Sequence, residues 1–437
     1  MRKILLAAVL LSATAYAQPR NWTLADCISY ALDNNISIKQ SELNVQQKEI
    51  AVSTAEGRRL PGVSAGSSQN FSFGRGLTSD NTYANTNTTS TSFSIGAEVP
   101  IFQGFDITNG IKLSKLDLAA ATSDLEKARD DIRVAVAQAY VQILYSKELL
   151  QVARNQVSID RQQLDRITAL MESGRASGAE VAAQKATLAR STLSETQASG
   201  NLRIALLDLS QLLELGSPEG FDIVTPSPGV LEPGLLMNPD EIYAEAVEVK
   251  PSVLSEKLRL DYAATAIKRA KGGFLPSLSL SGGLGTNFYT ASGRPSLSLG
   301  EQIRNNFSQY VGLSLNIPIF SRFATRNQVR TAQLSFQNQE LQLENTRKSL
   351  FKEIQQAYYN AVTAQGKCVS SREAAASAAT AFELTKEKFE NGKANSTEYD
   401  QSKNRWMEAE SEFLQSRYEC LFQTKLLDFY RGKDLDF

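Results

Sequence analysis

The side chains that most often carry out catalysis or bind metals are scarce in this chain. Its 437 residues include no histidine and three cysteines, Cys27, Cys368 and Cys420. The cysteines do not have zinc-site spacing, and the sequence contains no phosphate loop, no catalytic triad and no cluster of metal ligands. No two acidic residues lie in a sequence pattern typical of a compact domain, where they could act as a catalytic pair. We therefore expect no enzyme activity, no catalytic residue, no cofactor and no metal.

The N-terminal residues predict export. Arg2 and Lys3 precede the apolar run ILLAAVLL, and the tripeptide AYA at 15–17 is a small-x-small cleavage site. This arrangement predicts a signal peptide over residues 1–17, because the apolar run falls short of the about 20 residues that a membrane-spanning helix needs. An odd number of cysteines in an exported chain leaves at least one without an intrachain partner, and the sequence leaves a Cys27–Cys420 pairing open.

The rest of the chain is slightly acidic. Removal of Arg2 and Lys3 leaves 44 Lys and Arg against 47 Asp and Glu, a formal charge of −3. Nucleic-acid-binding domains are ordinarily basic, so we expect no nucleic-acid partner. No later stretch of the sequence is apolar over a helix-spanning length, so any crossing of a membrane must use strands.

An internal duplication organises the sequence. A shift of 218 in residue number aligns Pro100 with Pro318, in the junctions VPIF and IPIF, and Gly174 with Gly392 farther on. Before these junctions the shift is 215, which indicates a loop of different length. Chance similarity between two helical segments would not keep prolines, glycines and apolar positions in step, so the two halves are predicted to share one architecture.

Each half is predicted to contain a helix, two strands and two long helices. The first repeat is 18–215, with strands at about 62–74 and 91–102 and long helices at about 106–172 and 178–215. The second repeat is 240–437, with strands at about 277–289 and 307–320 and long helices at about 322–389 and 395–431. Residues 216–239 are rich in proline and glycine and predict a linker or equatorial segment.

The predicted strands alternate between apolar and small polar side chains. In the segment 92–99, Phe93, Ile95 and Val99 share one face, whereas serine and glycine occupy much of the other. Strands of about ten residues with this pattern can cross a bilayer at a tilt. The alternative is a soluble sheet packed on a core, but the sequence offers little to cover the apolar face. Four strands cannot close a barrel, so several copies of the chain would be required.

The long helices are too long for a compact globule. A helix over 106–172 would extend about 100 Å, and its apolar residues recur at heptad spacing, which indicates supercoiled packing. A simple dimeric coiled coil is the alternative, but alanine, glutamine and serine cover several helix faces. Each helix pair turns at Gly174 or Gly392, and Ser177 or Asn395 can cap the next helix.

The export signal, the duplicated element order, the VPIF and IPIF junctions and the G-x-x-S/N turns together resemble the TolC-like outer-membrane efflux protein family. The resemblance covers essentially the whole mature chain. It implies an α+β membrane protein, a homotrimer in which four strands per chain form a twelve-stranded outer-membrane β-barrel continued by a long periplasmic α-helical barrel. Pro100 and Pro318 would mark the barrel-to-helix junctions.

The resemblance also implies a function. The chain would be the passive outer-membrane exit duct of a tripartite efflux or type I secretion system, gated at its periplasmic helix tips. Its partners would be a periplasmic adaptor, an inner-membrane RND, ABC or MFS transporter, and outer-membrane lipid. The alternative is a non-conducting periplasmic coiled-coil scaffold or an adhesin-like structural protein.

Candidate site residues follow from the same resemblance. The adaptor would contact the helix tips at Gly174, Arg175, Gly392 and Lys393. Glu398 is the first candidate for an acid that lines the narrowed pore, with Asp400 and Glu180 behind it. The segment departs from the paired-aspartate pattern of such a ring, and Glu398 would also suit a first-turn acid that faces the helix dipole.

Overall fold

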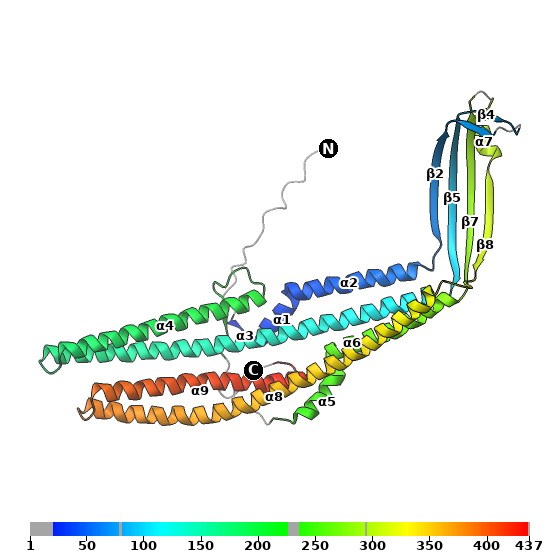
Figure 1. The fold of residues 1–437 in the computed structure, drawn as a ribbon. Helices are drawn as coiled ribbons and strands as arrows, with labels where there is room; N and C mark the ends of the chain where they lie inside the picture. The colour runs from blue at the N-terminus through cyan, green and yellow to red at the C-terminus, as the bar shows by residue number, and fades with distance from the viewer. Residues whose placement is uncertain (1–20, 78–80, 226–235, 293–294, 436–437) are drawn as a thin grey trace, which may run out of the picture. The chain divides into compact units, whose positions relative to one another are not determined.

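The computed structural model describes residues 21–77, 81–225, 236–292 and 295–435 (Figure 1). The predicted signal peptide at 1–17 and part of the predicted linker lie outside the described residues. The chain divides into two compact units: unit 1 comprises Met1–Glu42, Asp124–Val253 and Arg347–Phe437, and unit 2 comprises Leu43–Ser123 and Leu254–Thr346. Each unit therefore takes residues from both predicted repeats.

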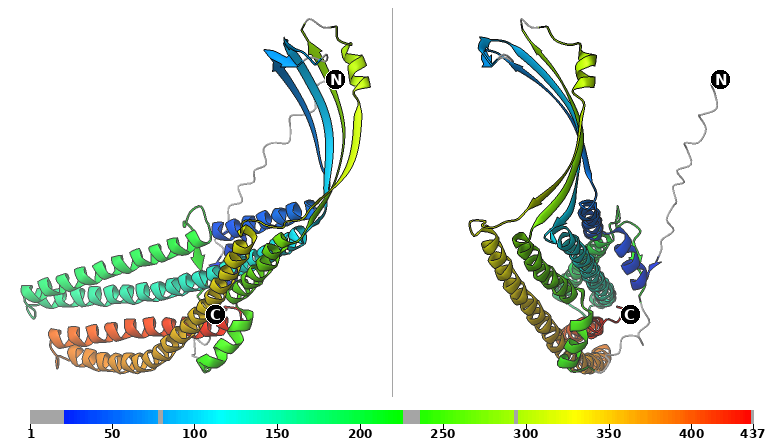
Figure 2. Two further views of the ribbon diagram at one scale, coloured as in Figure 1. Left: turned by 45° about the vertical axis from the view of Figure 1, so that its right-hand side comes forward. Right: turned by 90° about the vertical axis from the view of Figure 1, so that its right-hand side faces the viewer.

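Unit 2 contains an antiparallel sheet in which the neighbours follow the order β2, β5, β7, β8 (Figures 1 and 2). The strands are β2 (Gly62–Ser72), β5 (Thr88–Gln103), β7 (Ser277–Ala291) and β8 (Ser308–Asn316). β5 and β7 come from different repeats, and Phe93 lies opposite Thr286 in their register. The sheet therefore joins the two halves of the duplication.

The strand connections differ from the sequence expectation. β8 ends at Asn316, earlier than the predicted 320, because Asn316 already pairs with Ser277 at the start of β7 and Pro318 has no N–H to extend the ladder. A short hairpin of β3 (Arg75–Leu77) and β4 (Tyr83–Asn85) and a helix, α7 (Leu299–Asn305), occupy the connections. The polar sequence of these connections gave no sign of α7.

One face of the sheet is apolar and exposed in the single chain. Val311, Leu313 and Leu315 of β8 alternate along the strand and are 82%, 67% and 61% exposed. Phe93 and Ile95 on β5 are also exposed. Such a contiguous apolar surface marks a face that something else covers.

The helices repeat in length. α3 (Asp106–Glu172) and α8 (Ala324–Glu390) each have 67 residues, and α4 (Gly178–Leu212) and α9 (Ser396–Tyr430) each have 35. In unit 1, α4 lies beside the C-terminal part of α3, and α9 beside that of α8 (Figure 1). Within the described residues, no helix combines the length and apolar character needed to cross a membrane. The shorter helices are α1 (Leu24–Asn34), α2 (Ile36–Gly57), α5 (Pro239–Val249) and α6 (Pro251–Lys271).

The main core of unit 1 lies between helices of both repeats. Its buried residues include Cys27 of α1, Leu144 of α3, Leu209 of α4 and Tyr418 of α9. A short parallel pair, β1 (Asn21–Trp22) with β6 (Asp222–Ile223), closes one side of this core. The hydroxyl of Tyr140 donates a 2.6 Å hydrogen bond to the carbonyl of Val224, just after β6, and so attaches this pair to α3.

The two proline junctions contain the same aromatic contact. Phe102 packs edge-to-face on Phe105 with ring centroids 5.2 Å apart, and Phe320 packs on Phe323 at 5.6 Å. Such pairs contribute about 0.5–1.5 kcal/mol beyond the area they bury. The repeated motif in the sequence therefore encodes a repeated packing unit.

The two junctions also share a backbone conformation, the left-handed region with positive φ, which residues other than glycine rarely adopt. The residue before each second phenylalanine, Gly104 or Arg322, has a φ of 55° or 51°, and the phenylalanines Phe105 and Phe323 have φ of 64° and 63°. The first junction needs glycine for a second reason: a Cβ on Gly104 would overlap the carbonyl oxygen of Gly272. Arg322 retains a side chain in the same conformation.

Substitution of Gly104 by alanine should therefore destabilise the protein more than substitution of Arg322 by glycine. A left-handed alanine costs about 1–2 kcal/mol, and the overlap with Gly272 adds to that cost. Arg322→Gly is the matched variant, since glycine adopts this φ without strain. We expect a lower melting temperature for Gly104→Ala than for wild type in detergent, followed by circular dichroism, and no loss for Arg322→Gly. Equal melting of Gly104→Ala and wild type would contradict this account.

Candidate functional site

The two long helix pairs of unit 1 turn at glycines with left-handed backbone. Gly174 has a φ of 74° and Gly392 a φ of 70°. The N–H of the following residue, Arg175 or Lys393, donates to a carbonyl of the preceding helix at 2.8 or 2.7 Å. This closes the C-terminal end of α3 and of α8. Gly174, Arg175, Gly392 and Lys393 are all exposed.

The acids Glu180 and Glu398 cap the helices that follow these turns. The Ser177 hydroxyl accepts from the Glu180 N–H at 3.2 Å, and the Glu180 carboxylate accepts from the Ser177 N–H at 2.7 Å. Asn395 and Glu398 form the same reciprocal pair at 2.8 and 3.4 Å. Both glutamates are exposed. The structure thus gives Glu398 the first-turn role that the sequence left open, and this role does not by itself require a pore.

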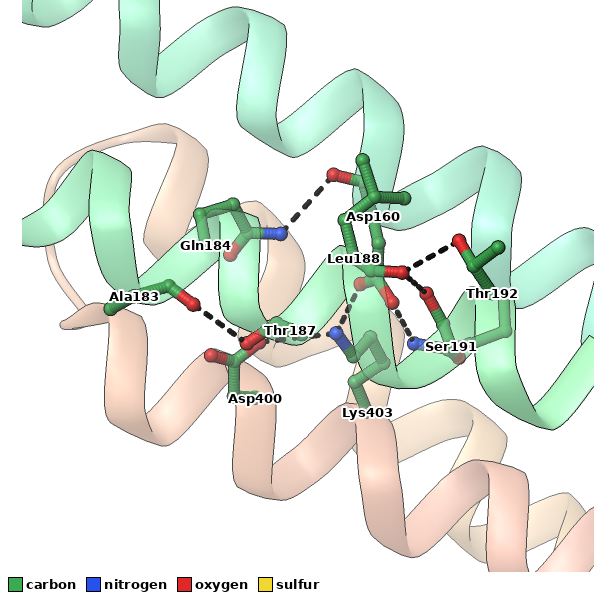
Figure 3. A network of polar contacts seen from close by, with 10 residues as sticks. Asp160, Ala183, Gln184, Thr187, Leu188, Ser191, Thr192, Asp400 and Lys403 are labelled. Atoms are coloured by element: carbon green, nitrogen blue, oxygen red, sulfur yellow. Dashed lines mark hydrogen bonds and ion pairs between the residues drawn. The ribbon is translucent and has the colours of Figure 1, made fainter.

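The third predicted acid, Asp400, belongs to a buried network (Figure 3). Lys403 of α9 lies with its Nζ 2.5 Å from the carboxylate of Asp160 on α3 and 3.1 Å from that of Asp400. The Lys403 and Asp160 side chains are 0% and 1% exposed, whereas the Asp400 side chain is 32% exposed. An ammonium therefore sits between carboxylates from two different helix pairs.

Amide side chains complete the environment of Asp160. The second carboxylate oxygen accepts a 2.9 Å hydrogen bond from Gln156, one turn earlier on α3. Gln184 of α4, which is buried, donates to the Asp160 backbone carbonyl at 3.2 Å. α3, α4 and α9 therefore meet in one polar network (Figure 3).

Aromatic side chains surround the same network. Phe382 of α8 stacks on Trp406 of α9 with centroids 5.1 Å apart, and Phe389 stacks on Tyr399 at 4.9 Å. Burial, and then the charges of Asp160 and Asp400, raise the pKa of Tyr399 to about 12, so its hydroxyl stays neutral at physiological pH. The ring of Tyr399 brings this aromatic group to the ion pair, because its centroid lies 5.8 Å from the Lys403 Nζ.

Arg166 makes a second link between the helix pairs, nearer the turns. Its guanidinium lies 5.1 Å from the ring centroid of Phe389 and donates to the carbonyl of Glu390 at 3.4 Å. Because Arg166 is on α3 and Phe389 and Glu390 are on α8, this contact again joins the first repeat to the second. The cation–π part of such a contact contributes about 0.5–2 kcal/mol.

The burial of Lys403 and Asp160 has an energetic consequence. Dehydrating two charges is costly, and their attraction offsets that cost only when the geometry and the surrounding hydrogen bonds are good. If the helices separate, water can solvate both charges again. The pair therefore specifies one arrangement of α3 and α9 without locking it permanently, because hydration offsets much of the loss on separation.

The ion pair is not repeated at the equivalent positions of the duplication. The shift of 218 relates Lys403 to Lys185, which is exposed, and Asp160 to Ala378. The two copies have therefore diverged at this point. Within the described residues, no group of acidic and cysteine side chains is arranged to hold a metal ion.

Sequence reasoning did not identify Asp160, Lys403 or Arg166. A signal was present: Asp160 follows the buried Val157 by three positions and precedes the buried Ile167 by seven, so a charge occupies a position on the buried heptad face. Its partner lies 243 residues away in the chain, and no local pattern relates the two.

Comparison with known proteins gives consistent matches. The sequence pattern of the family described as "Outer membrane efflux protein" matches residues 27–214 and 242–430. Outer membrane protein TolC of Escherichia coli is 24% identical in an alignment of 367 positions that covers 79% of this chain and 71% of TolC. Proteases secretion protein PrtF of Dickeya chrysanthemi is 24% identical in an alignment of 446 positions that covers 96% of this chain and 90% of PrtF. The CmeC outer membrane channel of Campylobacter jejuni superposes with a TM-score of 0.79 at 18% identity, covering 95% of this chain and 87% of CmeC.

Proposed function

The chain belongs to the outer membrane efflux protein family, and from this premise we propose that the Asp160–Lys403 ion pair keeps the periplasmic end of its duct closed. The resemblance inferred from the sequence is thus confirmed. The chain is an outer-membrane exit duct of efflux or type I secretion and extends into the periplasm. We further propose that it catalyses no reaction itself. Family membership favours an exit duct over the alternative of a non-conducting scaffold.

The proposed assembly is a homotrimer. Each copy would contribute β2, β5, β7 and β8 to one twelve-stranded barrel, with the exposed apolar face of Val311, Leu313 and Leu315 toward outer-membrane lipid. The support is physical: β2 and β8 are edge strands, and unpaired backbone groups are not tolerated in lipid. The channel recordings below test this assembly, because an open sheet cannot enclose a pore.

The proposed partners are a periplasmic adaptor and an inner-membrane transporter of the RND, ABC or MFS class. The turns at Gly174, Arg175, Gly392 and Lys393 are exposed and rigidly closed by hydrogen bonds, which suits a docking surface. The inner-membrane transporter, and not this chain, would select the cargo.

A photo-crosslinking residue at Arg175 or Lys393 should capture the adaptor in intact cells. The control position is Arg203 of α4, which is also exposed but lies toward the end of that helix opposite the turn at Gly174. The captured protein is identified by mass spectrometry. Equal capture from Arg203 and from the turns, or none from the turns when the adaptor is co-produced, would contradict docking at the tips.

We call the Asp160–Lys403 ion pair the latch, and we assign it this role because it lies near the helix turns. Asp160 lies on α3 about four helical turns before Gly174, and Lys403 lies on α9 about three turns after Gly392, so the pair is roughly 20 Å from the tips. It joins the α3–α4 pair to the α8–α9 pair. We propose that the duct widens there when these two pairs separate. Arg166 adds a second contact between the same pairs closer to the tips.

Lys403→Ala should shift the channel toward the open state. The variant leaves Asp160 buried without its cation, which costs the closed arrangement about 3–5 kcal/mol, and about 3 kcal/mol corresponds to roughly a hundredfold change in an equilibrium constant. We expect higher conductance in planar-bilayer recordings than for wild type. Lys185→Ala is the control, because it removes the repeat-equivalent exposed lysine. If both variants conduct alike while both form trimers on gels, the latch is refuted.

Glu398 is proposed as an acid of the narrowed pore in addition to its cap. The variant Glu398→Gln separates the two roles, because glutamine can still accept from the Asn395 N–H but carries no charge. We expect weaker block by divalent cations in bilayer recordings for Glu398→Gln, whereas Glu180→Gln, the matched cap of the first repeat, should have a smaller effect. Unchanged block in Glu398→Gln would leave Glu398 with its capping role alone.

A further inference from the structure

Cys368 of α8 and Cys420 of α9 lie against each other between the two helices. Each is 2% exposed, and both belong to one small core cluster with Ala364. The thiols are free in the structure and close enough for a hydrogen bond between them.

The antiparallel register of α8 and α9 supports this juxtaposition independently. The hydroxyls of Ser371 and Ser416 hydrogen-bond at 2.6 Å, and Phe382 stacks on Trp406 farther along the same pair. Counting 14 residues along both helices from the Phe382–Trp406 contact places Cys368 opposite Cys420, and counting from the serine pair places Cys368 within one residue of that register. The two cysteines thus occupy facing positions of a well-defined helix pair.

We propose that Cys368 and Cys420 are joined by a disulfide in the exported protein. Two thiols lose two protons and two electrons and form one S–S bond. The electron acceptor is the disulfide of a periplasmic thiol oxidoreductase, which leaves as a dithiol after two exchange steps. Secreted chains meet such oxidants, whereas cytosolic thiols stay reduced.

The exchange must precede the final packing of the helix pair. Burial, and then the neighbouring Cys368, raise the pKa of the Cys420 thiol above its usual range, and the thiolate is the reactive form. A thiol that is 2% exposed also offers no access to a protein oxidant. The bond therefore forms while α8 and α9 are still accessible, and packing then protects it.

The structure excludes Cys27 from this bond. Cys27 is fully buried in the main core of unit 1, a different cluster from that of Cys420, and burial followed by the charge of Asp26 raises its pKa to about 12. The Cys27–Cys420 pairing that the sequence left open is therefore not formed, because the fold places Cys420 against Cys368. Cys27 remains an unreactive free thiol.

The first repeat has leucines at the positions equivalent to Cys368 and Cys420. The shift of 218 relates Cys368 to Leu150, which is buried, and Cys420 to Leu202, which is partly buried. A plain apolar pair therefore satisfies this layer of the helix packing. The disulfide would add a covalent constraint to the α8–α9 pair alone, fixing the register of the two helices at a layer several turns away from Gly392.

Thiol counting on the intact protein tests the proposal. Cells are lysed in denaturing detergent that contains N-ethylmaleimide, so that buried thiols also react, and the chain is weighed by mass spectrometry before and after reduction and a second alkylation. We expect one modified thiol before reduction, at Cys27, and three after it. Peptide mapping should find Cys368 linked to Cys420. Three modified thiols without reduction, or a bond from Cys27 to another chain, would overturn the proposal.

Three variants separate the bond from ordinary packing. Cys368→Ser should free Cys420 for alkylation, whereas Cys27→Ser should leave the bond intact. The double variant Cys368→Leu/Cys420→Leu copies the first repeat and should fold without a disulfide. Reductant should lower the melting temperature of wild type but leave that of the double variant unchanged; an equal response of both would count against the bond.

Discussion

The pairing of β5 with β7 is the interaction on which the arrangement of unit 2 depends. These strands come from different repeats, and their ladder runs from Thr88–Ala291 to Gln103–Ser277 with one irregularity between Pro100 and Phe102. Proline cannot donate to a ladder, so the shift occurs where the chain leaves the sheet. The pairing fixes the distance between Gly104 and Gly272, whose backbones approach too closely for any Cβ on Gly104. Strands of the two repeats are thereby joined in one sheet of unit 2.

Duplication explains the scaffold, and divergence explains the site. Helix lengths, turn glycines and caps are shared by both repeats, since each meets the same local need to end one helix and begin the next. The buried charges of Asp160 and Lys403 are not shared, because Ala378 stands where the second repeat would carry the acid. Cys368 and Cys420 replace leucines in the same way. Specific polar and thiol chemistry thus appears where the copies stopped being alike.

The sequence predicted the parts of the fold that local rules determine. The long helix expected at about 106–172 is α3, Asp106–Glu172, because a glycine and a cap residue define its end within a few residues. α7 was not expected, since its stability depends on Gln302, which bonds the backbone of Tyr289 on β7. The Asp160–Lys403 pair was missed for a similar reason: a partner 243 residues away leaves no periodic trace. The caps at Ser177 and Asn395 depend only on residues within three positions of each other, and the sequence predicted both.

The equal lengths of the paired helices restrict how this chain can evolve. Adding one residue to an α-helix rotates everything beyond it by about 100°, which would turn a buried heptad face toward water. α3 and α8 have kept 67 residues each, while the offset between the repeats changes from 215 to 218 only before the VPIF and IPIF junctions. Insertions and deletions have thus been absorbed in the connections of the sheet. Descendants of this lineage should differ in length there long before they differ in their helices.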